Sequence, residues 1–143
     1  MKQIAIIDLL HEAKKAAKPA YAPYSKYRVG AAMLVSDGTI FHGCNVENAS
    51  YGLTICAERV ALSSAIAAGH RRFKAMAIVA GGKNAPSPCG ACRQVLAEFC
   101  KPDFPVYFAS AMNINKFKRM SLAKLLPETF KREGITECAE ADG

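Results

Sequence analysis

Two short cysteine-containing segments restrict most strongly what this chain can fold into. The first is Cys56-Ala57-Glu58, and the second is Pro88-Cys89-Gly90-Ala91-Cys92. Each stands at the start of a predicted helix, and Cys89 and Cys92, spaced i and i+3, share one face of theirs. A fold that brings the two helix starts together places three sulfur atoms and one carboxylate in a single pocket.

The hydrophobic pattern predicts an α/β fold in which helices are layered on a mixed sheet. Ser87 followed by Pro88 predicts the start of the third helix, with Ser87 as its N-cap. The expected order is αββαβαβ, followed by a weaker strand and a short helix. The elements are a helix over 2–18, strands over 27–35 and 39–43, a helix over 56–68, a strand over 73–80, a helix from 88, strands over 104–109 and 115–120, and a helix capped by Ser121.

The length and composition are those of one ordinary domain. The chain has 143 residues, of which 51% are hydrophobic and 22% charged. We assign residues 1–132 to this domain and residues 133–143 to an acidic, frayed tail. No apolar run approaches the roughly 18 residues that a membrane span needs. We therefore expect a cytoplasmic protein with no membrane partner.

The net charge of +7 does not by itself indicate a nucleic-acid partner. The basic residues are scattered or paired, as in Lys14-Lys15 and Arg71-Arg72, and form no long run. This arrangement favours an ordinary solvated surface, so we expect no nucleic acid to bind.

The three clustered cysteines predict a zinc site. Six cysteines are too few for a disulfide scaffold in a chain of this length. Soft thiolates select zinc or iron–sulfur centres over hard cations, and three protein ligands leave a fourth position open for water, as in catalytic zinc sites. Helix N-termini also lower thiol pKa values. We expect one Zn²⁺ per subunit, bound by Cys56, Cys89 and Cys92.

Charged neighbours of these cysteines have predicted functions of their own. Glu58 is two residues past one ligand, where it can reach a water at the metal and act as a general acid and base. Arg59 and Arg93 directly follow Glu58 and Cys92, so we expect one or both to donate hydrogen bonds to cysteine sulfur.

Two other functions of the cysteines remain open. A structural zinc site needs a fourth ligand, which Cys44 or Cys100 could supply, but such sites usually pair two close-spaced motifs and this chain has one. A redox function would use Cys89 and Cys92 alone, and would leave Cys56 and Glu58 without a function.

Taken together, the motifs resemble the zinc-dependent cytidine deaminases of the small, three-cysteine, homotetrameric type. The similarity extends from the first helix to Leu125-Leu126-Pro127. It implies a three-layer fold, with a mixed five-stranded sheet and helices on both faces. It also implies hydrolytic deamination of cytidine and 2′-deoxycytidine in pyrimidine salvage. The segments that carry it are Cys44-Asn45-Val46-Glu47-Asn48-Ala49, Cys56-Ala57-Glu58-Arg59 and Pro88-Cys89-Gly90-Ala91-Cys92-Arg93-Gln94.

The resemblance implies a proton-transfer function for Glu58. It would take a proton from the attacking water, deliver it to ring N3, and later help to protonate the departing amine. Water would add at C4 of the cytosine ring, and collapse of the adduct would leave a uracil ring on the sugar and release ammonia.

The resemblance also assigns substrate contacts. Asn45 and Glu47 match a pair that binds the ribose 3′-hydroxyl, with Val46 between them in the same substrate-binding segment. The Ala57 backbone and the Cys89 region would contact the base. Tyr27 stands where the family commonly has a phenylalanine beside the base, so its hydroxyl needs a partner or water.

A homotetramer is expected for two reasons. The helix over 56–68 is nearly all small or apolar, which exceeds what one subunit of this size easily covers. By resemblance, Ala49 and Tyr51 would reach a neighbouring subunit's site, and Phe130 would pack over the base across the interface or serve as a plain core or interface residue.

Two other classes of substrate are less favoured by the sequence. A polynucleotide deaminase would need stacking aromatics, but the chain has no tryptophan and only 8% aromatic residues. A clamp on the 3′-hydroxyl would also clash with a continuing strand. A modified aminonucleoside is disfavoured only by Asn45 and Glu47.

Overall fold

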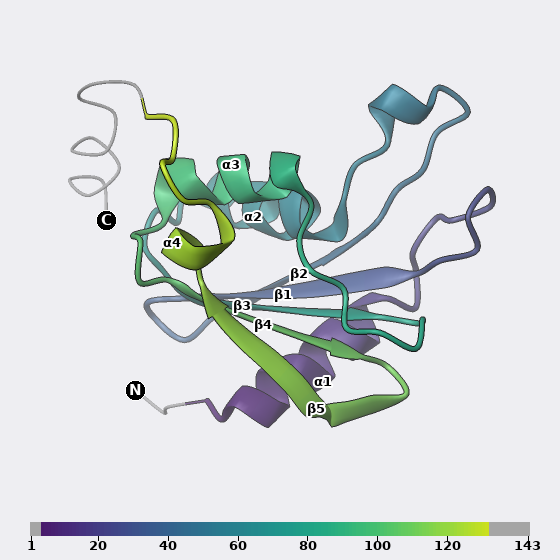
Figure 1. The fold of residues 1–143 in the computed structure, drawn as a ribbon, viewed down its shortest axis with the longest axis horizontal. Helices are drawn as coiled ribbons and strands as arrows, with labels where there is room; N and C mark the ends of the chain where they lie inside the picture. The colour runs from purple at the N-terminus through teal and green to yellow at the C-terminus, as the bar shows by residue number, and fades with distance from the viewer. Residues whose placement is uncertain (1–3, 132–143) are drawn as a thin grey trace.

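The computed structural model describes residues 4–131, which fold into one mixed sheet flanked by helices (Figure 1). The proposed acidic tail over 133–143 lies outside the described residues. In chain order the elements are α1 (Ile6–Ala16), β1 (Val29–Val35), β2 (Ile40–Cys44), the 3₁₀ helix η1 (Tyr51–Leu53), α2 (Ala57–Ala67), β3 (Phe73–Ala80), α3 (Gly90–Phe99), β4 (Pro105–Ser110), β5 (Asn113–Ser121) and α4 (Leu122–Leu125).

The sheet has five strands in the order β2-β1-β3-β4-β5. Strand β1 is antiparallel to β2 and to β3, and β4 is antiparallel to β5. The central pair β3 and β4 is parallel, and α3 supplies the crossover between them. The predicted mixed five-stranded sheet is therefore confirmed.

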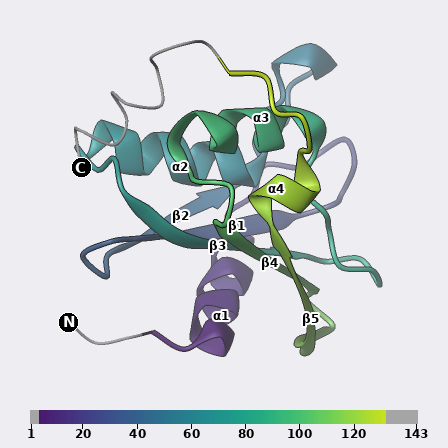
Figure 2. The ribbon, with the colours of Figure 1, turned by 60° about the vertical axis from the view of Figure 1, so that its left-hand side comes forward.

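The sheet separates two helical layers, as Figure 2 shows. On one face, α1 packs Leu9, Leu10 and Ala13 against small and aliphatic strand residues. On the other face, α2, α3 and α4 cover a second core that includes Leu62 and Leu96. Two buried faces explain why β3 reads as a continuous apolar run in the sequence.

Glycines let both helical layers approach the sheet closely. A Cβ at Gly30 would lie 2.0 Å from the Ala13 carbonyl oxygen, and one at Gly43 would lie 2.3 Å from the Ala57 carbonyl oxygen. No side chain fits at either position. The Gly43 contact fixes the first turn of α2 on β2.

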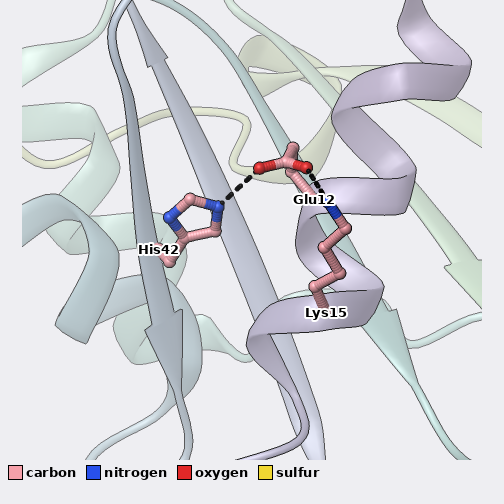
Figure 3. Close-up of polar contacts among 3 residues, drawn as sticks. All are labelled: Glu12, Lys15 and His42. Atoms are coloured by element: carbon pink, nitrogen blue, oxygen red, sulfur yellow. Dashed lines mark hydrogen bonds and ion pairs between the residues drawn. The ribbon is translucent and has the colours of Figure 1, made fainter.

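A small ionic cluster connects α1 to the edge strand β2 (Figure 3). The Glu12 carboxylate lies 3.0 Å from Lys15 Nζ and 3.0 Å from His42 Nε2. The hydrogen bonds from Lys15 and then His42 lower the pKa of Glu12. All three side chains are partly exposed, so the cluster contributes little to stability.

One sequence prediction about the helices needs correction. Ser87 is not the N-cap of α3: the helix begins at Gly90, and the cap is Cys89, whose sulfur accepts a hydrogen bond from Cys92 N–H. In the single chain, Ser63, Ser64 and Ala67 of α2 are exposed. Among residues 4–131, no helix is long and apolar enough to cross a membrane.

Candidate metal centre and substrate pocket

The sulfur atoms of Cys56, Cys89 and Cys92 meet between the first turns of α2 and α3. All three lie within 4.8 Å of one another. The sulfur–sulfur distance is 3.7 Å between Cys56 and Cys89 and 3.3 Å between Cys89 and Cys92. The fold thus joins two segments that lie far apart in the sequence.

These spacings fit a single tetrahedral zinc ion. Zinc–sulfur bonds of about 2.3 Å at tetrahedral angles place ligand sulfurs about 3.8 Å apart. Within the described part of the chain, neither Cys44 nor Cys100 joins the group. Three sulfur ligands and no fourth match the open donor set of a catalytic zinc site better than the closed set of a structural site.

Both cysteine groups stand at helix N-termini, as the sequence predicted. Cys56 is the N-cap of α2, and Cys89 is the N-cap of α3. The pKa of Cys56 is lowered by hydrogen bonding from the Cys92 thiol, then from Arg59 and Cys89. The cluster therefore favours a thiolate before any metal binds.

Glu58 lies in the first turn of α2 beside this cluster, with 5% of its surface exposed. Burial raises its pKa above the usual glutamate range, and the negative charge of Cys56 adds to the effect. A raised pKa suits a carboxyl group that must take up a proton and return it.

The two arginines have different partners. Arg59 Nη2 donates to Cys56 Sγ at 3.5 Å and to the Thr54 carbonyl oxygen at 3.4 Å. Arg93 instead donates to the Pro88 carbonyl at 2.7 Å and the Leu125 carbonyl at 2.6 Å. Arg59 can thus offset charge on the sulfurs, whereas the hydrogen bonds of Arg93 hold the segment before α3 against α4.

The side chain of Asn45 holds neighbouring backbone. Its Oδ1 accepts from Val29 N–H at 2.9 Å, and its Nδ2 donates to the Tyr27 carbonyl at 2.8 Å. The residue is 8% exposed. Both ends of the amide are therefore engaged at the start of β1, although each keeps capacity for one further hydrogen bond.

Glu47 lies at the mouth of a cavity of about 440 Å³. Its Oε1 accepts hydrogen bonds from Tyr24 N–H at 3.0 Å and Ser25 N–H at 3.2 Å, and its Oε2 accepts one from Ser25 Oγ. Tyr24, Ser25, Tyr51 and Thr54 complete the cavity wall. Arg59 connects Thr54 in this wall to the cysteine cluster.

Three further substrate candidates lie near these groups. Tyr27 is 40% exposed, and its ring packs on Gly82, where a Cβ would lie 3.1 Å from Tyr27 Cε1. Burial raises the pKa of Tyr27, and so does the charge of Glu58, which places the phenol within electrostatic reach of that carboxylate. Ala57 is fully buried, while Val46 is 39% exposed and bridges Tyr21 and Ile55 through backbone pairing.

The residues predicted to act across subunits are all exposed in the single chain. Tyr51 is 74% exposed, and its ring contacts the Tyr24 ring edge-on at 5.9 Å. Phe130 is 77% exposed, and its carbonyl accepts a hydrogen bond from Gln94. Ala49 is also exposed. None of the three is part of this chain's own core.

Sequence reasoning missed the functions of Ser25 and Thr54. Ser25 holds Glu47 across 22 positions, and Thr54 acts through its backbone carbonyl. No sequence pattern in the segment Ala22-Pro23-Tyr24-Ser25-Lys26-Tyr27 indicates which carboxylate its N–H groups bind.

A second cavity does not touch the cysteine cluster. Its volume is about 580 Å³, and it is formed where β3 and β4 begin and α3 ends. Its lining includes Arg71, Phe73, Phe99 and Cys100 but no residue of the cysteine cluster. Size alone therefore does not identify the reactive site.

Comparisons with known proteins agree with this geometry. Residues 5–108 match the family model described as the cytidine and deoxycytidylate deaminase zinc-binding region. The chain is 51% identical over 132 residues to a cytidine deaminase of Sporosarcina psychrophila, which covers 92% of this chain and 96% of that one.

Solved structures give the same result. The fold is similar to a cytidine deaminase of Burkholderia pseudomallei, with a TM-score of 0.85, 48% identity, and coverage of 89% of this chain and 100% of that one. A cytidine deaminase of Mycobacterium tuberculosis is similar with a TM-score of 0.78, 39% identity, and coverage of 91% and 100%. With a matching family model, a matching fold and a three-sulfur cluster that fits zinc, this chain belongs to the zinc-binding cytidine and deoxycytidylate deaminase family.

Proposed function

We propose that this protein is a zinc-dependent hydrolase that converts cytidine and 2′-deoxycytidine to uridine and 2′-deoxyuridine with release of ammonia. This is the chemistry of nucleoside salvage. The observation that carries the proposal is the buried carboxyl group of Glu58 beside three sulfurs that converge within 4.8 Å. Two relatives whose alignments cover 92% and 90% of this chain are named cytidine deaminases.

Cys56, Cys89 and Cys92 would hold the metal, and Arg59 would offset part of their negative charge. A bound zinc ion supplies Lewis-acid activation of water at a position that no protein ligand takes. The adjacent N-termini of α2 and α3 support this assignment, because their N–H groups favour thiolates at the same place.

Glu58 would move the protons of the reaction. It would take one from the attacking water as the C4–oxygen bond forms, and deliver it to ring N3. It would then take the proton of the C4 hydroxyl and pass it to the amine, so that the C4–nitrogen bond breaks, the C4 carbonyl forms and ammonia leaves. The raised pKa of Glu58 supports this function, because the group must accept and release a proton in each turnover.

Glu47 would accept a hydrogen bond from the ribose. The resemblance pairs Asn45 with Glu47 at the 3′-hydroxyl, but both ends of the Asn45 amide already bind backbone groups, so Asn45 would instead position the strand beside Glu47. The cavity of about 440 Å³ at Glu47 supports this assignment, as does the Arg59 contact between its wall and the cysteines. The Ala57 backbone, the Cys89 region, Val46 and Tyr27 would then face the base or complete its pocket.

A homotetramer is part of the proposal. Exposed apolar residues form two groups: backbone bridges connect Tyr21, Val46 and Ile55, and a ring contact connects Tyr24 and Tyr51. Exposed apolar groups of this kind are typical of an interface. Tyr51 belongs to one of them, and Ala49 lies in the same loop, so a neighbouring subunit would complete the pocket. Sedimentation showing a monomer at micromolar concentration would contradict this assembly.

Three smaller assignments complete the proposal. Residues 1–132 would form the catalytic domain and 133–143 an acidic tail, so a chain truncated after residue 132 should retain turnover. Reactive thiols at a metal site suit a reducing compartment, so we assign the protein to the cytoplasm. Free nucleosides, not polynucleotides, would be its substrates.

The test is ammonia release from cytidine by the purified protein, with zinc content measured in parallel. Glu58→Gln should keep the zinc and lose at least about a hundredfold in kcat, because general acid–base catalysis contributes that much. Absence of turnover in the zinc-loaded parent would refute the substrate assignment. Equal turnover of a cytosine-containing oligonucleotide would point to nucleic-acid substrates instead.

A further inference from the structure

The carboxylate of Glu47 is held by donors from a single turn. The backbone N–H groups of Tyr24 and Ser25 donate to Oε1 at 3.0 Å and 3.2 Å, and the Ser25 hydroxyl donates to Oε2. All three donors come from the segment between α1 and β1. The turn and the carboxylate therefore form one unit, although they are distant in the sequence.

The proton of the Ser25 hydroxyl has a defined direction. Tyr27 N–H donates to Ser25 Oγ at 3.0 Å, so this oxygen already acts as an acceptor on one side. A hydroxyl has a single proton, which is then directed at Glu47. Lys26 closes the turn in the left-handed conformation, with φ 59°, and its N–H donates to the Ala22 carbonyl at 3.0 Å.

The two carboxylate oxygens of Glu47 differ in their remaining capacity to accept hydrogen bonds. Oε1 accepts two N–H groups, which use both of its lone pairs. Oε2 accepts the Ser25 hydroxyl and keeps a lone pair for a ligand. Ser25 and Glu47 both line the cavity of about 440 Å³. A hydroxyl group of a ligand would thus bind the same oxygen that Ser25 orients.

The hydrogen bond from Ser25 also affects ionisation. Together with the backbone N–H groups, it lowers the pKa of Glu47 below the usual glutamate range. At neutral pH the side chain is then an acceptor only. A sugar hydroxyl can donate to it, and the charged acceptor makes that hydrogen bond stronger than a neutral one.

We propose that Ser25 is a positioning residue that orients Oε2 of Glu47 to accept a hydrogen bond from the sugar 3′-hydroxyl of the nucleoside. The proposal rests on the proposed function, because it takes the cavity at Glu47 as the site of the sugar. Ser25 acts through Glu47 and makes no contact with the reacting ring atoms. Its hydroxyl therefore affects mainly how substrates with a 3′-hydroxyl bind.

The test compares steady-state kinetics of the wild-type protein, Ser25→Ala and Ser25→Thr on cytidine and on 2′,3′-dideoxycytidine, which lacks the 3′-hydroxyl. Ser25→Ala should raise KM for cytidine about tenfold and change kcat less than about twofold, as expected when one charge-assisted hydrogen bond of binding is lost. On the dideoxy substrate, its kcat/KM should equal that of the wild type. Ser25→Thr, which keeps the hydroxyl, should restore the KM for cytidine.

An equal loss of kcat/KM on both substrates would show that Ser25 serves only the fold of the turn, and no loss on cytidine would show that it has no function in binding. Either result overturns the proposal. Urea unfolding of each variant gives an independent measure of folding. In a Glu47→Gln background, adding Ser25→Ala should cost no further kcat/KM on cytidine, because the interaction is already lost.

Different results refute the proposed function and the function of Ser25. A zinc-loaded wild-type protein that releases no ammonia from cytidine refutes the proposed function, and the Ser25 proposal falls with it. An active wild type whose Ser25→Ala variant shows no discrimination between the two substrates refutes the Ser25 proposal alone.

Discussion

The guanidinium of Arg59 donates to the sulfur of Cys56 from one turn further along α2, at 3.5 Å. The same group reaches the Thr54 carbonyl, so it lies between the cysteine cluster and the wall of the Glu47 cavity. Arg59 thus places a positive charge beside the sulfurs while one of its buried N–H groups, at Nε, has no hydrogen-bond partner among the described residues.

Replacing Arg59 by glutamine should weaken zinc binding. Three thiolates exceed the charge of one zinc ion, and Arg59 offsets part of the excess. We expect a loss of about tenfold to a hundredfold in zinc affinity, measured by competition with a chromogenic chelator.

Arg71→Gln is the matched control, because Arg71 lies near the other end of α2 and donates to the Ile66 and His70 carbonyls. It should leave zinc affinity unchanged. Equal affinities for the wild type and Arg59→Gln would show that the contact with Cys56 has no electrostatic effect on the metal.

Gly43→Ala should damage both folding and the metal site. The added Cβ would lie 2.3 Å from the Ala57 carbonyl oxygen and 2.4 Å from Ala61 N–H nitrogen, and both are backbone atoms that cannot rotate away. The first turn of α2 must then move off β2 with Cys56 and Glu58. We expect a loss of roughly 1–3 kcal/mol in the free energy of unfolding, as overpacking typically costs, together with weaker zinc binding.

Gly52→Ala provides the comparison, because a Cβ at Gly52 meets nothing within 4 Å. Urea unfolding and zinc titration of both variants separate the steric effect from a general effect of losing a glycine. If Gly43→Ala were as stable as Gly52→Ala, the close packing of β2 on α2 would be wrong.

Much of the metal site could be predicted from the sequence because its determinants are local. Cys56 and Cys89 stand directly before visible helical periodicity, and the i, i+3 spacing of Cys89 and Cys92 requires no knowledge of the tertiary fold. The position of Glu58 beside the sulfurs follows from the same helical register, because it lies two residues after Cys56. The strand over 73–80 was predicted with its observed bounds, because a strand buried on both faces is uniformly apolar.

The remaining contacts depend on how distant segments meet. Arg93 follows Cys92 in sequence, yet adjacent residues of a helix point in different directions, so its side chain reaches Leu125 and not the sulfurs. Arg59, by contrast, is three residues after Cys56 and lies on the same side of the helix as that cysteine. Ser87 resembled an N-cap, but its hydroxyl accepts from Arg93 at 2.7 Å, and the sulfur of Cys89 caps the helix.

Arg93→Gln should therefore lower stability without a direct effect on the sulfurs. The guanidinium makes three short hydrogen bonds, to Pro88, Leu125 and Ser87, which tie the segment before α3 to the end of α4. Losing them should lower the free energy of unfolding by about 2–3 kcal/mol, since buried carbonyls are left without donors. Urea unfolding at fixed protein and zinc concentrations measures the change.

Arg93→Lys provides a second measure of the same interaction. A lysine keeps the charge but lacks the planar fork, so it should recover less than half of the lost stability. Full recovery would mean that charge alone, and not the three directed hydrogen bonds, holds the two segments together.

Asn45→Asp should impair folding and turnover together, unlike the Ser25 variant. The aspartate keeps an acceptor for Val29 N–H, but its second oxygen replaces the amide nitrogen that donates to the Tyr27 carbonyl at 2.8 Å. The aspartate oxygen and the Tyr27 carbonyl oxygen, both acceptors, then face each other at a position that is 8% exposed. We expect a loss of about 2–3 kcal/mol in the free energy of unfolding, the cost of an unsatisfied buried group.

Because Tyr27 moves with its carbonyl, the Asn45→Asp variant should lose kcat/KM for cytidine and for 2′,3′-dideoxycytidine alike. A loss confined to cytidine, with unchanged stability, would show that Asn45 acts on the sugar and not on the backbone of β1.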